Sequence, residues 1–508
     1  MAVAHNLAYD LRISDAFAQL ARRGFALTML RMDGGSAWAE WRRDGRTLTM
    51  VDSVSWLGTS LESVAAAVGL SKAVLPAWDA DDAEWLQRCV GDVDVLREAW
   101  LRIVRWISAD DMGTFKPTGA GQGWAAFRHR WMDTPILHHG HADLAEIERE
   151  ATYAGRCEAW RWGQLTGGPW VEWDYSAAYA QVAHDCEVPV RLLGHMGPRA
   201  ADRALSGRQG RCNLIRARIT TEVPTAPQRT AQGVRWPVGT FTSWLWDVEV
   251  DQVRREGGHV DALEGYSYAA APALRTWARW VLDALDAGPD QLDPVCRMVV
   301  KGWSRSVVGR FGASWAGWED YGEAFADQLS LSYATHRDTG RQFRLLSVGD
   351  RTWAETDRRD APDSAIAVMS WITAACRVRL WSAMRHAGLE NVAYCDTDGL
   401  LVNSEGSHRL DAAGLPGLRP KQRYRRIEVL GPRQLVIEGR LKAAGIPSRA
   451  VRVGDQTWRG EVWRSLPVAL GAGETDTVVI ASRTWEVVGV DHRRAHLPGG
   501  LTAPLRAD

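Results

Sequence analysis

The chain has 508 residues, of which 46% are hydrophobic and 24% charged, and its formal net charge at pH 7 is −1. This length exceeds what one hydrophobic core usually holds, so several domains or subdomains are expected. A net charge near zero excludes a uniformly basic nucleic-acid-binding protein, and any such binding must come from local basic patches.

The apolar runs and the cysteines predict a cytoplasmic protein. No run approaches the ~20 apolar residues needed to cross a membrane, and the first residues have neither the basic nor the apolar region of a signal peptide. The seven cysteines include no Cys-x-x-Cys pair. We therefore expect a reducing compartment and no membrane partner.

Residues 1–110 alternate short apolar runs with helical patterns, which predicts an α/β region. The last helical pattern is expected to bury an apolar stripe that includes Leu86, Val93 and Trp100. Strands are expected over 5–9, 26–31, 37–42 and 47–57, and helices over 11–23, 61–68 and 83–107.

Residues 269–309 predict a helical hairpin whose second arm begins after Asp293, a good N-cap that is followed by proline. On this arm Arg297, Lys301 and Arg305 recur every four residues, which places three cations on one helix face. Arg275 and Arg279 have the same spacing on the first arm. Helical arginines are usually solvated or paired, but acidic residues are scarce on these faces, and this favours a bound anion.

Two segments place aspartates at strand ends. A short apolar run ends at Asp174, and a helical pattern follows at once. After a helix expected over 363–386, Asp396 and Asp398 lie one residue apart between two apolar runs. Asp-Thr-Asp alone is equally typical of an ordinary turn. With Asp174 as a third carboxylate, the pattern favours two Mg²⁺ ions ~3.5–4 Å apart that clamp the reacting oxygens of a phosphoryl transfer.

These segments, in this order, resemble the motifs of the family B DNA polymerases over nearly the whole chain. Asp174 to Ala180 resembles motif A, Lys301 to Gly309 resembles motif B, and Tyr394 to Gly399 resembles motif C. The element that holds the primer terminus in that family is matched only in part, at Arg433 to Leu435. The resemblance implies a mixed α/β, right-hand fold of palm, fingers and thumb, preceded by an RNase H-like, exonuclease-type domain.

The resemblance also implies roles for single residues. Asp174, Asp396 and Asp398 would hold two Mg²⁺ ions, or Mn²⁺, and catalyse nucleotidyl transfer. Arg305 and Val308 stand where motif B has Asn and Tyr, so we expect weaker stacking on the nascent base pair and a stronger grip on phosphate. The residues expected to bind the nucleotide are Tyr179, Arg275, Arg297, Lys301 and Arg305, and those expected to contact DNA are Tyr394, Lys442 and Asn6.

The amino-terminal residues resemble a proofreading 3′–5′ exonuclease domain. His5 to Asp10 resembles its second motif, and Asp92 its third. The Asp-x-Glu of the first motif is not found before His5. Since a two-metal hydrolytic site needs those carboxylates, we expect a truncated and inactive remnant.

The gaps between the motifs are similar to those of the protein-primed phage and plasmid branch. Expected partners are primer–template DNA, deoxynucleoside triphosphates and a terminal priming protein. Two hypotheses stay open: a DNA polymerase without proofreading, favoured by the three carboxylates, and a polymerase-derived DNA-binding protein with impaired catalysis, favoured by the altered motif B. The expected domains are 1–145 (exonuclease-like), 146–268 (connector and palm), 269–312 (fingers), 313–430 (insertion and palm) and 431–508 (thumb and tail).

Overall fold

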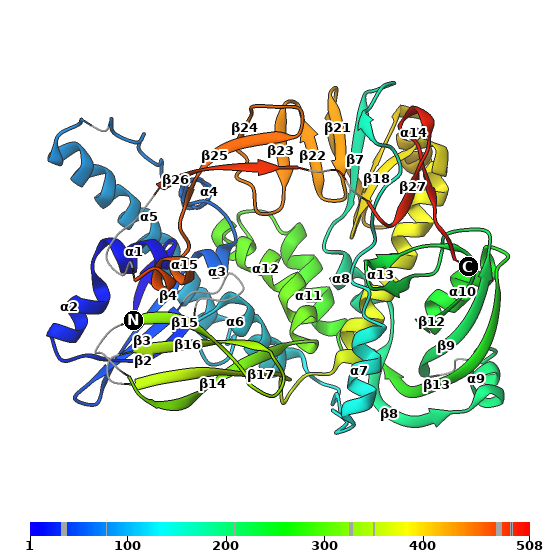
Figure 1. The fold of residues 1–508 in the computed structure, drawn as a ribbon, viewed down its shortest axis with the longest axis horizontal. Helices are drawn as coiled ribbons and strands as arrows, with labels where there is room; N and C mark the ends of the chain where they lie inside the picture. Colours follow the sequence, from blue (N-terminus) through cyan, green and yellow to red (C-terminus); the bar gives the residue numbers. More distant parts are fainter. Residues whose placement is uncertain are drawn as a thin grey trace. The chain divides into compact units, whose positions relative to one another are not determined.

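The structure is a computed structural model that describes residues 1–31, 38–77, 79–207, 210–324, 329–348, 351–473, 480–487, 489 and 491–507. The chain forms two compact units, each built from separate segments (Figure 1). Unit 1 contains Met1–Met132, Trp280–Pro362 and Trp463–Ala481, and unit 2 contains Asp133–Arg279, Asp363–Val462 and Ser482–Asp508. None of the helices described is both long and apolar enough to cross a membrane.

Unit 1 contains two four-stranded sheets that share one core. The first has the order β1-β4-β3-β2 and the second the order β14-β17-β16-β15. Leu30 and Trp41 of the first sheet, Leu331 and Leu346 of the second, and Leu466 of α15 are buried together. The bounds are β1 (Ala2–Ala4), β2 (Ala26–Arg31), β3 (Trp38–Arg43), β4 (Arg46–Asp52), β14 (Ser314–Glu323), β15 (Ser330–Thr335), β16 (Gln342–Val348), β17 (Arg351–Asp360) and α15 (Leu466–Gly471).

Two strand predictions near the amino terminus are wrong. The expected strand over 5–9 is interrupted because Asn6 has a left-handed backbone and α1 (Leu7–Ile13) begins after it, followed by α2 (Ala16–Arg22). The expected strand over 47–57 ends at Asp52, whose carboxylate accepts hydrogen bonds from the backbone N–H groups of Asn6 and Val54. These bonds fix the start of α3 (Val54–Leu57).

The helix expected over 83–107 is present as α5 (Asp82–Ala109), and its expected apolar stripe is wrong in part, because Trp100 is buried but Leu86 and Val93 are not. Leu86 is 65% exposed and Val93 61% exposed, whereas Val95 and Ile103 are buried. Both stripes obey the helical repeat, so periodicity alone did not identify the packed face. The other helices of unit 1 are α4 (Leu61–Val68), α6 (Gly119–Ala126), the π-helix Phe127–Trp131 and α12 (Pro294–Phe311).

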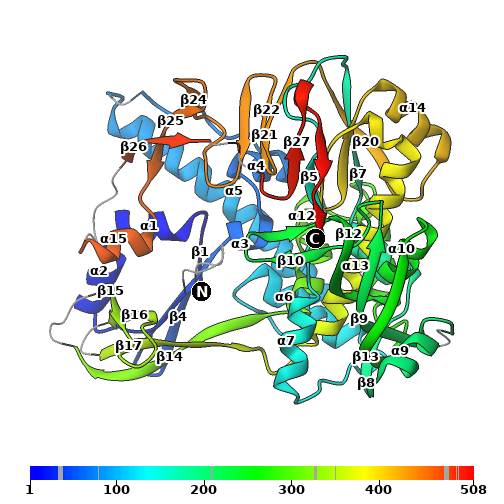
Figure 2. The ribbon, with the colours of Figure 1, turned by 45° about the vertical axis from the view of Figure 1, so that its right-hand side comes forward.

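Unit 2 contains the five-stranded antiparallel sheet that carries the candidate site, with the order β20-β7-β19-β18-β5. Figure 2 labels β5, β7 and β20 of this sheet. Helix α13 (Ile366–Ala387) packs against this sheet and is buried on almost every side. The bounds are β5 (Cys157–Ala159), β7 (Trp170–Tyr175), β18 (Val392–Asp396), β19 (Gly399–Val402) and β20 (Leu418–Tyr424), with the flanking helices α7 (Ala142–Glu150), α8 (Ala178–Asp185) and α14 (Ser404–Ala413) and the 3₁₀ turn Leu389–Asn391.

A second five-stranded sheet of unit 2 has the order β29-β12-β9-β13-β8. One face packs on α9 and α10 around Ile215, Ile219 and Val253. The bounds are β8 (Val188–Met196), α9 (Pro198–Ala204), β9 (Arg211–Thr221), β12 (Val238–Trp246), α10 (Asp247–Arg255), β13 (His259–Ala271) and β29 (Arg506–Ala507).

The first arm of the predicted hairpin begins later than expected, because β13 extends to Ala271 and α11 (Arg275–Asp286) starts only after Pro272.

The remaining strands described form smaller sheets. The bounds are β6 (Gly163–Gln164), β10 (Gln228–Thr230), β11 (Gly233–Arg235), β21 (Ile427–Gly431), β22 (Gln434–Ile437), β23 (Arg440–Ala443), β24 (Val451–Arg452), β25 (Thr457–Trp463) and β26 (Ile480–Glu486).

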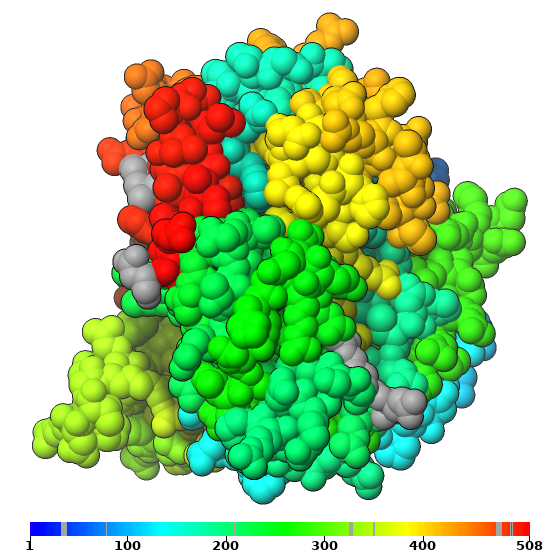
Figure 3. Space-filling model, turned by 90° about the vertical axis from the view of Figure 1, so that its right-hand side faces the viewer, coloured from blue at the N-terminus to red at the C-terminus, as the bar shows by residue number. Residues whose placement is uncertain are grey.

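The segment after His492, which contains several proline and glycine residues, is an integral part of unit 2. Strands β27 (Arg494–His496) and β28 (Thr502–Pro504) form a hairpin around the 3₁₀ turn Pro498–Gly500. The Trp162 N–H donates to the carbonyl of Gly500, and β29 pairs with β12. Figure 3 shows this red segment lying against the cyan part of the same unit. Backbone pairing, which composition does not reveal, holds the segment in place.

Candidate functional site

The three predicted carboxylates meet at one edge of the β20-β7-β19-β18-β5 sheet. Asp174 lies near the end of β7 opposite Gly399 of β19, and Gly399 lies opposite Asp396 of β18. Residues directly opposite on antiparallel strands have Cβ atoms only about 4.5–5.5 Å apart. Asp398 occupies the turn between β18 and β19, where its carbonyl accepts a hydrogen bond from the Tyr175 N–H at 2.9 Å.

The turn that carries Asp396 and Asp398 is held in a constrained conformation. Thr397 has a positive φ of 59°, which is uncommon for a β-branched residue. Its hydroxyl donates to Asp396 Oδ1 at 2.9 Å, and its N–H donates to the Arg156 carbonyl at 2.7 Å. A Cβ added to Gly155 would lie 2.5 Å from Thr397 Oγ1. The 155–156 segment therefore clamps the turn and requires a glycine at 155.

Gly399 leaves room for the carboxylate of Asp174. A Cβ at Gly399 would lie 3.2 Å from Asp174 Oδ1 and 3.1 Å from the Trp173 carbonyl, which is closer than ordinary contact. The Asp174 side chain consequently leans over β19 toward the turn with Asp398. The absence of a side chain at 399 therefore leaves space beside the Asp174 carboxylate.

Burial and nearby charges both act on the Asp398 carboxylate. Burial, then the negative charge of Asp174, raises the pKa of Asp398 to about 6. Lys421 of β20 opposes this shift, and its ammonium lies 3.3 Å from Asp174 Oδ2 and 3.3 Å from Glu172 Oε1. On the other side of the site, Arg433 Nε lies 3.6 Å from Asp396 Oδ1.

The donor set fits a hard divalent cation. Three aspartates offer oxygen ligands of the kind that Mg²⁺ and Mn²⁺ prefer. Among the residues described, however, no group of three His, Cys, Asp or Glu side chains is gathered as a metal site. Two of the aspartates are instead paired with protein cations. A metal ion at this sheet edge would therefore have to replace Lys421 or Arg433.

Tyr394 forms a hydrogen bond that orients the Asp396 carboxylate. Its hydroxyl donates to Asp396 Oδ2 at 3.4 Å and accepts a hydrogen bond from the Arg433 N–H at 2.9 Å. The side chain is only 6% exposed. The ring lies inside the core beside Cys157, and a direct contact of Tyr394 with DNA stays a prediction.

Lys442 and Tyr179, two further predicted residues, lie in the same unit. Lys442 is exposed on β23, and its charge contributes to the lowered pKa of Glu172, although burial of Glu172 acts in the opposite direction. Tyr179 is half-buried in the first turn of α8. Arg275 Nε donates to the His184 carbonyl at 3.1 Å, so Arg275 closes the end of α8.

The cationic stripe on α12 is confirmed in unit 1. Arg297, Lys301 and Arg305 are all exposed, while Val307 and Val308 on the opposite face are buried. Arg297 also donates to the Ala287 carbonyl at 2.8 Å. The Val308 side chain is 1% exposed and belongs to the core, and its effect on stacking against the nascent base pair stays a prediction.

The exonuclease-like residues gather around a carboxylate that the sequence analysis missed. Burial, then the charge of Asp52 at the end of β4, raises the pKa of Asp10 to about 6. Asn6 donates its backbone N–H to Asp52 and serves as the left-handed start of α1. Asp92 forms an ion pair with Arg88 on α5. An aspartate at the end of a strand, as at Asp174, is the signal that could have identified Asp52.

A buried ion triad beneath the site was also missed. Glu158, on β5 opposite Cys395, accepts hydrogen bonds from Arg156 at 2.6 Å and from Arg494 at 3.0 Å. Burial alone would raise the pKa of Glu158, but the two guanidinium groups outweigh it and hold the pKa below its ordinary value. Arg494 also stacks on the Trp160 ring at 4.1 Å. The triad ties the segment after His492 to the strand next to Asp396.

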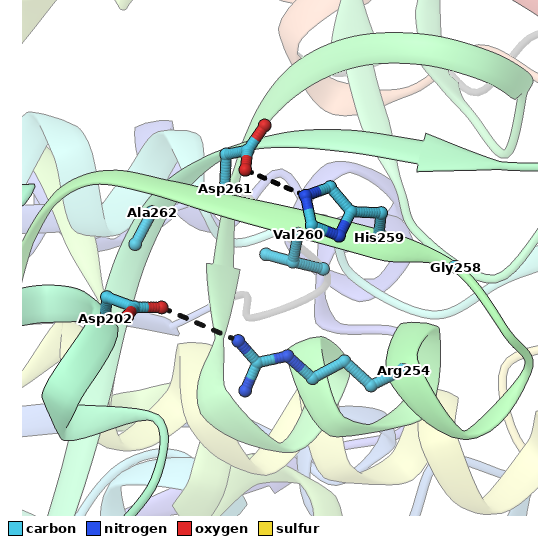
Figure 4. A pocket seen from close by; sticks show the side chains of 7 residues that line it. All are labelled: Asp202, Arg254, Gly258, His259, Val260, Asp261 and Ala262. Carbon is cyan, nitrogen blue, oxygen red and sulfur yellow. Dashed lines mark hydrogen bonds and ion pairs between the residues drawn. The ribbon is translucent and has the colours of Figure 1, made fainter.

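Two hollows in unit 2 differ in their position relative to the site and in their charged side chains. One, of about 360 Å³, adjoins the site and is lined by Tyr153, Gly155, Cys157, Val234, Trp236, Pro432, Arg433 and Arg493. Another of about 360 Å³ lies on β13, α9 and α10, where Arg254 pairs with Asp202 at 3.9 Å and His259 with Asp261 at 2.9 Å (Figure 4). The charged groups of this second hollow satisfy one another, whereas in the first Arg433 pairs with Asp396 at 3.6 Å and Arg493 pairs with Asp491 at 2.9 Å.

Comparisons with known proteins identify the fold alone. No family model and no curated protein matches the sequence. A solved structure of Phi29 DNA polymerase with primer–template DNA and incoming nucleotides is 14% identical, with a TM-score of 0.65 over 96% of this chain and 90% of that one. The same polymerase with primer–template DNA alone gives 13% identity and a TM-score of 0.66 over 95% and 90%. With single-stranded DNA it gives 13% and 0.64 over 96% and 90%. The chain therefore has a mixed α/β, DNA-polymerase-like fold.

Proposed function

We propose that this protein is a template-directed DNA polymerase of the family B type, which extends a primer by two-metal nucleotidyl transfer. The observation that carries the proposal is the meeting of Asp174, Asp396 and Asp398 at one sheet edge. Burial, together with the negative charges of Asp174 and Asp396, raises the pKa of Asp398 there. Such an arrangement is costly unless cations bind to it, and this supports a metal-dependent role.

Each side chain of the site has a part in the proposed reaction. Asp174 and Asp396 hold the cations, with Asp398 assisting, and Gly399 keeps the space between them free. When bound, two Mg²⁺ or Mn²⁺ ions would activate the primer 3′-hydroxyl and neutralise charge on the triphosphate. Tyr394 and Thr397 fix the orientation of the Asp396 carboxylate through its two oxygens.

The anionic substrates need cationic partners, and the chain offers two sets. Arg433 and Arg493 line the hollow beside Asp396, where they would bind the phosphates near the primer terminus. Arg297, Lys301 and Arg305 form the exposed stripe on α12, which would bind the triphosphate. We further infer that the primer terminus is the hydroxyl of a priming protein or of a nucleotide, and that proofreading is absent.

The alternative function is a polymerase-derived DNA-binding protein with impaired catalysis. It is favoured by the ion pairs that Lys421 and Arg433 already make with Asp174 and Asp396. Under this alternative, the two protein cations replace the metals permanently. DNA binding would then persist in the absence of divalent ions, and no nucleotide would be incorporated.

Incorporation of one labelled nucleotide into a primed template, with Mg²⁺ and separately with Mn²⁺, tests the proposal. Asp174→Asn and Asp396→Asn should each reduce the rate at least a thousandfold, since loss of a metal ligand costs about 4 kcal/mol of transition-state stabilisation. Asp411→Asn, on the exposed face of α14, is the control for a lost surface carboxylate. Fluorescence anisotropy with the same DNA separates the two functions. Tight binding without any incorporation by the wild type would support the alternative.

A further inference from the structure

Lys421 has an unusual position next to a catalytic carboxylate. It lies on β20, where the pairing with β7 skips a residue: Pro420 is opposite Trp173 and Gln422 is opposite Glu172. Lys421 is the extra residue of this β-bulge. Bulges commonly redirect one side chain of a strand, and here the bulge directs the Lys421 ammonium toward the carboxylates of β7.

The ammonium has two acceptors at equal distance. Asp174 Oδ2 and Glu172 Oε1 each lie 3.3 Å away. Glu172 is itself fixed, because the Tyr424 hydroxyl donates to its other oxygen at 2.5 Å. The Lys421 side chain is 56% exposed and thus free to shift between the two acceptors. Glu172 would keep the ammonium close even if Asp174 were occupied by another cation.

We propose that Lys421 is a tethered internal cation that competes with a divalent ion for Asp174 and retreats onto Glu172 when the ion binds. This inference rests on the proposed function, because it takes Asp174 to be a metal ligand. In the metal-free protein the ammonium reduces the repulsion between Asp174 and Asp398. On metal binding it stays beside the site as a cation, where the phosphates of a substrate can meet it.

The competition predicts a direct effect on metal affinity. Removal of the ammonium leaves Asp174 with a full negative charge facing the metal position, so a divalent ion should bind more tightly. Because Lys421 is more than half exposed, solvent screens the effect, and we expect a gain in affinity of about two- to fivefold. Glu172→Gln should weaken the tether and lower metal affinity, because the ammonium would then remain on Asp174.

Binding of Mn²⁺ to the full-length protein, followed by electron paramagnetic resonance without DNA or nucleotide, tests the inference. Lys421→Met should bind Mn²⁺ more tightly than the wild type, and Lys421→Arg should not. Arg423→Met is the matched control, since Arg423 is exposed on the same strand but lies opposite Val171. Far-ultraviolet circular dichroism verifies that each variant is folded.

Each outcome is decisive. Tighter binding in Lys421→Met alone supports the competition, whereas unchanged or weaker binding overturns it. Equal gains in Lys421→Met and Arg423→Met would mean that net charge alone matters, which also overturns it. If no variant binds Mn²⁺, both the inference and the metal-dependent function fail. If Mn²⁺ binds as expected but no nucleotide is incorporated, the inference stands and the polymerase function fails.

Discussion

Neutralising Glu158 should destabilise unit 2, although this residue is not expected to touch a substrate. Glu158 is fully buried between Arg156 and Arg494, which are 1% and 0% exposed at their side chains. Glu158→Gln keeps the shape but leaves two buried guanidinium groups without their shared counter-charge. Breaking a buried ion pair from one side typically costs 3–5 kcal/mol. Because Arg494 keeps its stacking on Trp160, we expect the lower end, about 3 kcal/mol.

Thermal unfolding followed by circular dichroism measures this effect. A loss of about 3 kcal/mol corresponds to a decrease in melting temperature of roughly 6–12 °C for a unit of this size. Glu222→Gln is the control, because Glu222 pairs with Arg506 at 3.5 Å while both side chains are about 70% exposed, and such pairs contribute little. A melting temperature of Glu158→Gln within about 2 °C of the wild type would refute the reasoning. It would mean that water or another group neutralises the arginines.

Two further predictions concern residues other than the proposed metal ligands. Gly155→Val should abolish incorporation and lower stability by roughly 1–3 kcal/mol, since its Cβ would strike Thr397. Gly140→Val, at a position with open space and no positive φ, is the control for a lost glycine, and wild-type activity of Gly155→Val would contradict the clamp. The His139 ring donates a hydrogen bond from Nε2 to the buried Glu148 carboxylate at 2.9 Å, which raises the pKa of His139. A raised pKa stabilises the fold fully below the unfolded value of about 6.5, and this contribution is lost as pH rises through the folded pKa. The stability difference between wild type and His139→Gln, from urea unfolding at pH 5.5 and pH 8.5, should therefore shrink at high pH; a constant difference would argue against the ion pair.

The position of the three aspartates in the sheet was largely predictable because they lie at or next to strand ends. Asp174, Asp396 and Asp398 each follow or interrupt a short apolar run, and the sheet then brings them to one edge. The stripe of Arg297, Lys301 and Arg305 was likewise predictable, since helical geometry alone decides which residues share a face.

What the sequence did not reveal depends on contacts between distant segments. The pairing of Lys421 with Asp174 needs a β-bulge whose position composition does not show. The buried face of α5 was predicted only in part, because two apolar stripes fit the same helical period and only tertiary packing selects one of them. The proline and glycine content of the segment after His492 is typical of loops, whereas backbone pairing and Arg494 hold this segment in place. Arg494 and its partner Glu158, for example, are 336 residues apart in the sequence.

That separation has a consequence for biosynthesis. Glu158 emerges from the ribosome long before Arg494, so the nascent sheet carries a buried carboxylate with only one of its two partners. Domains generally fold as units during translation, but unit 2 cannot be completed until residue 494 is free to pack. A chain released prematurely would therefore retain Asp174, Asp396 and Asp398 without the support of their sheet. The candidate site thus depends on nearly complete synthesis, and under the proposed function truncated products should neither compete for primers nor copy DNA.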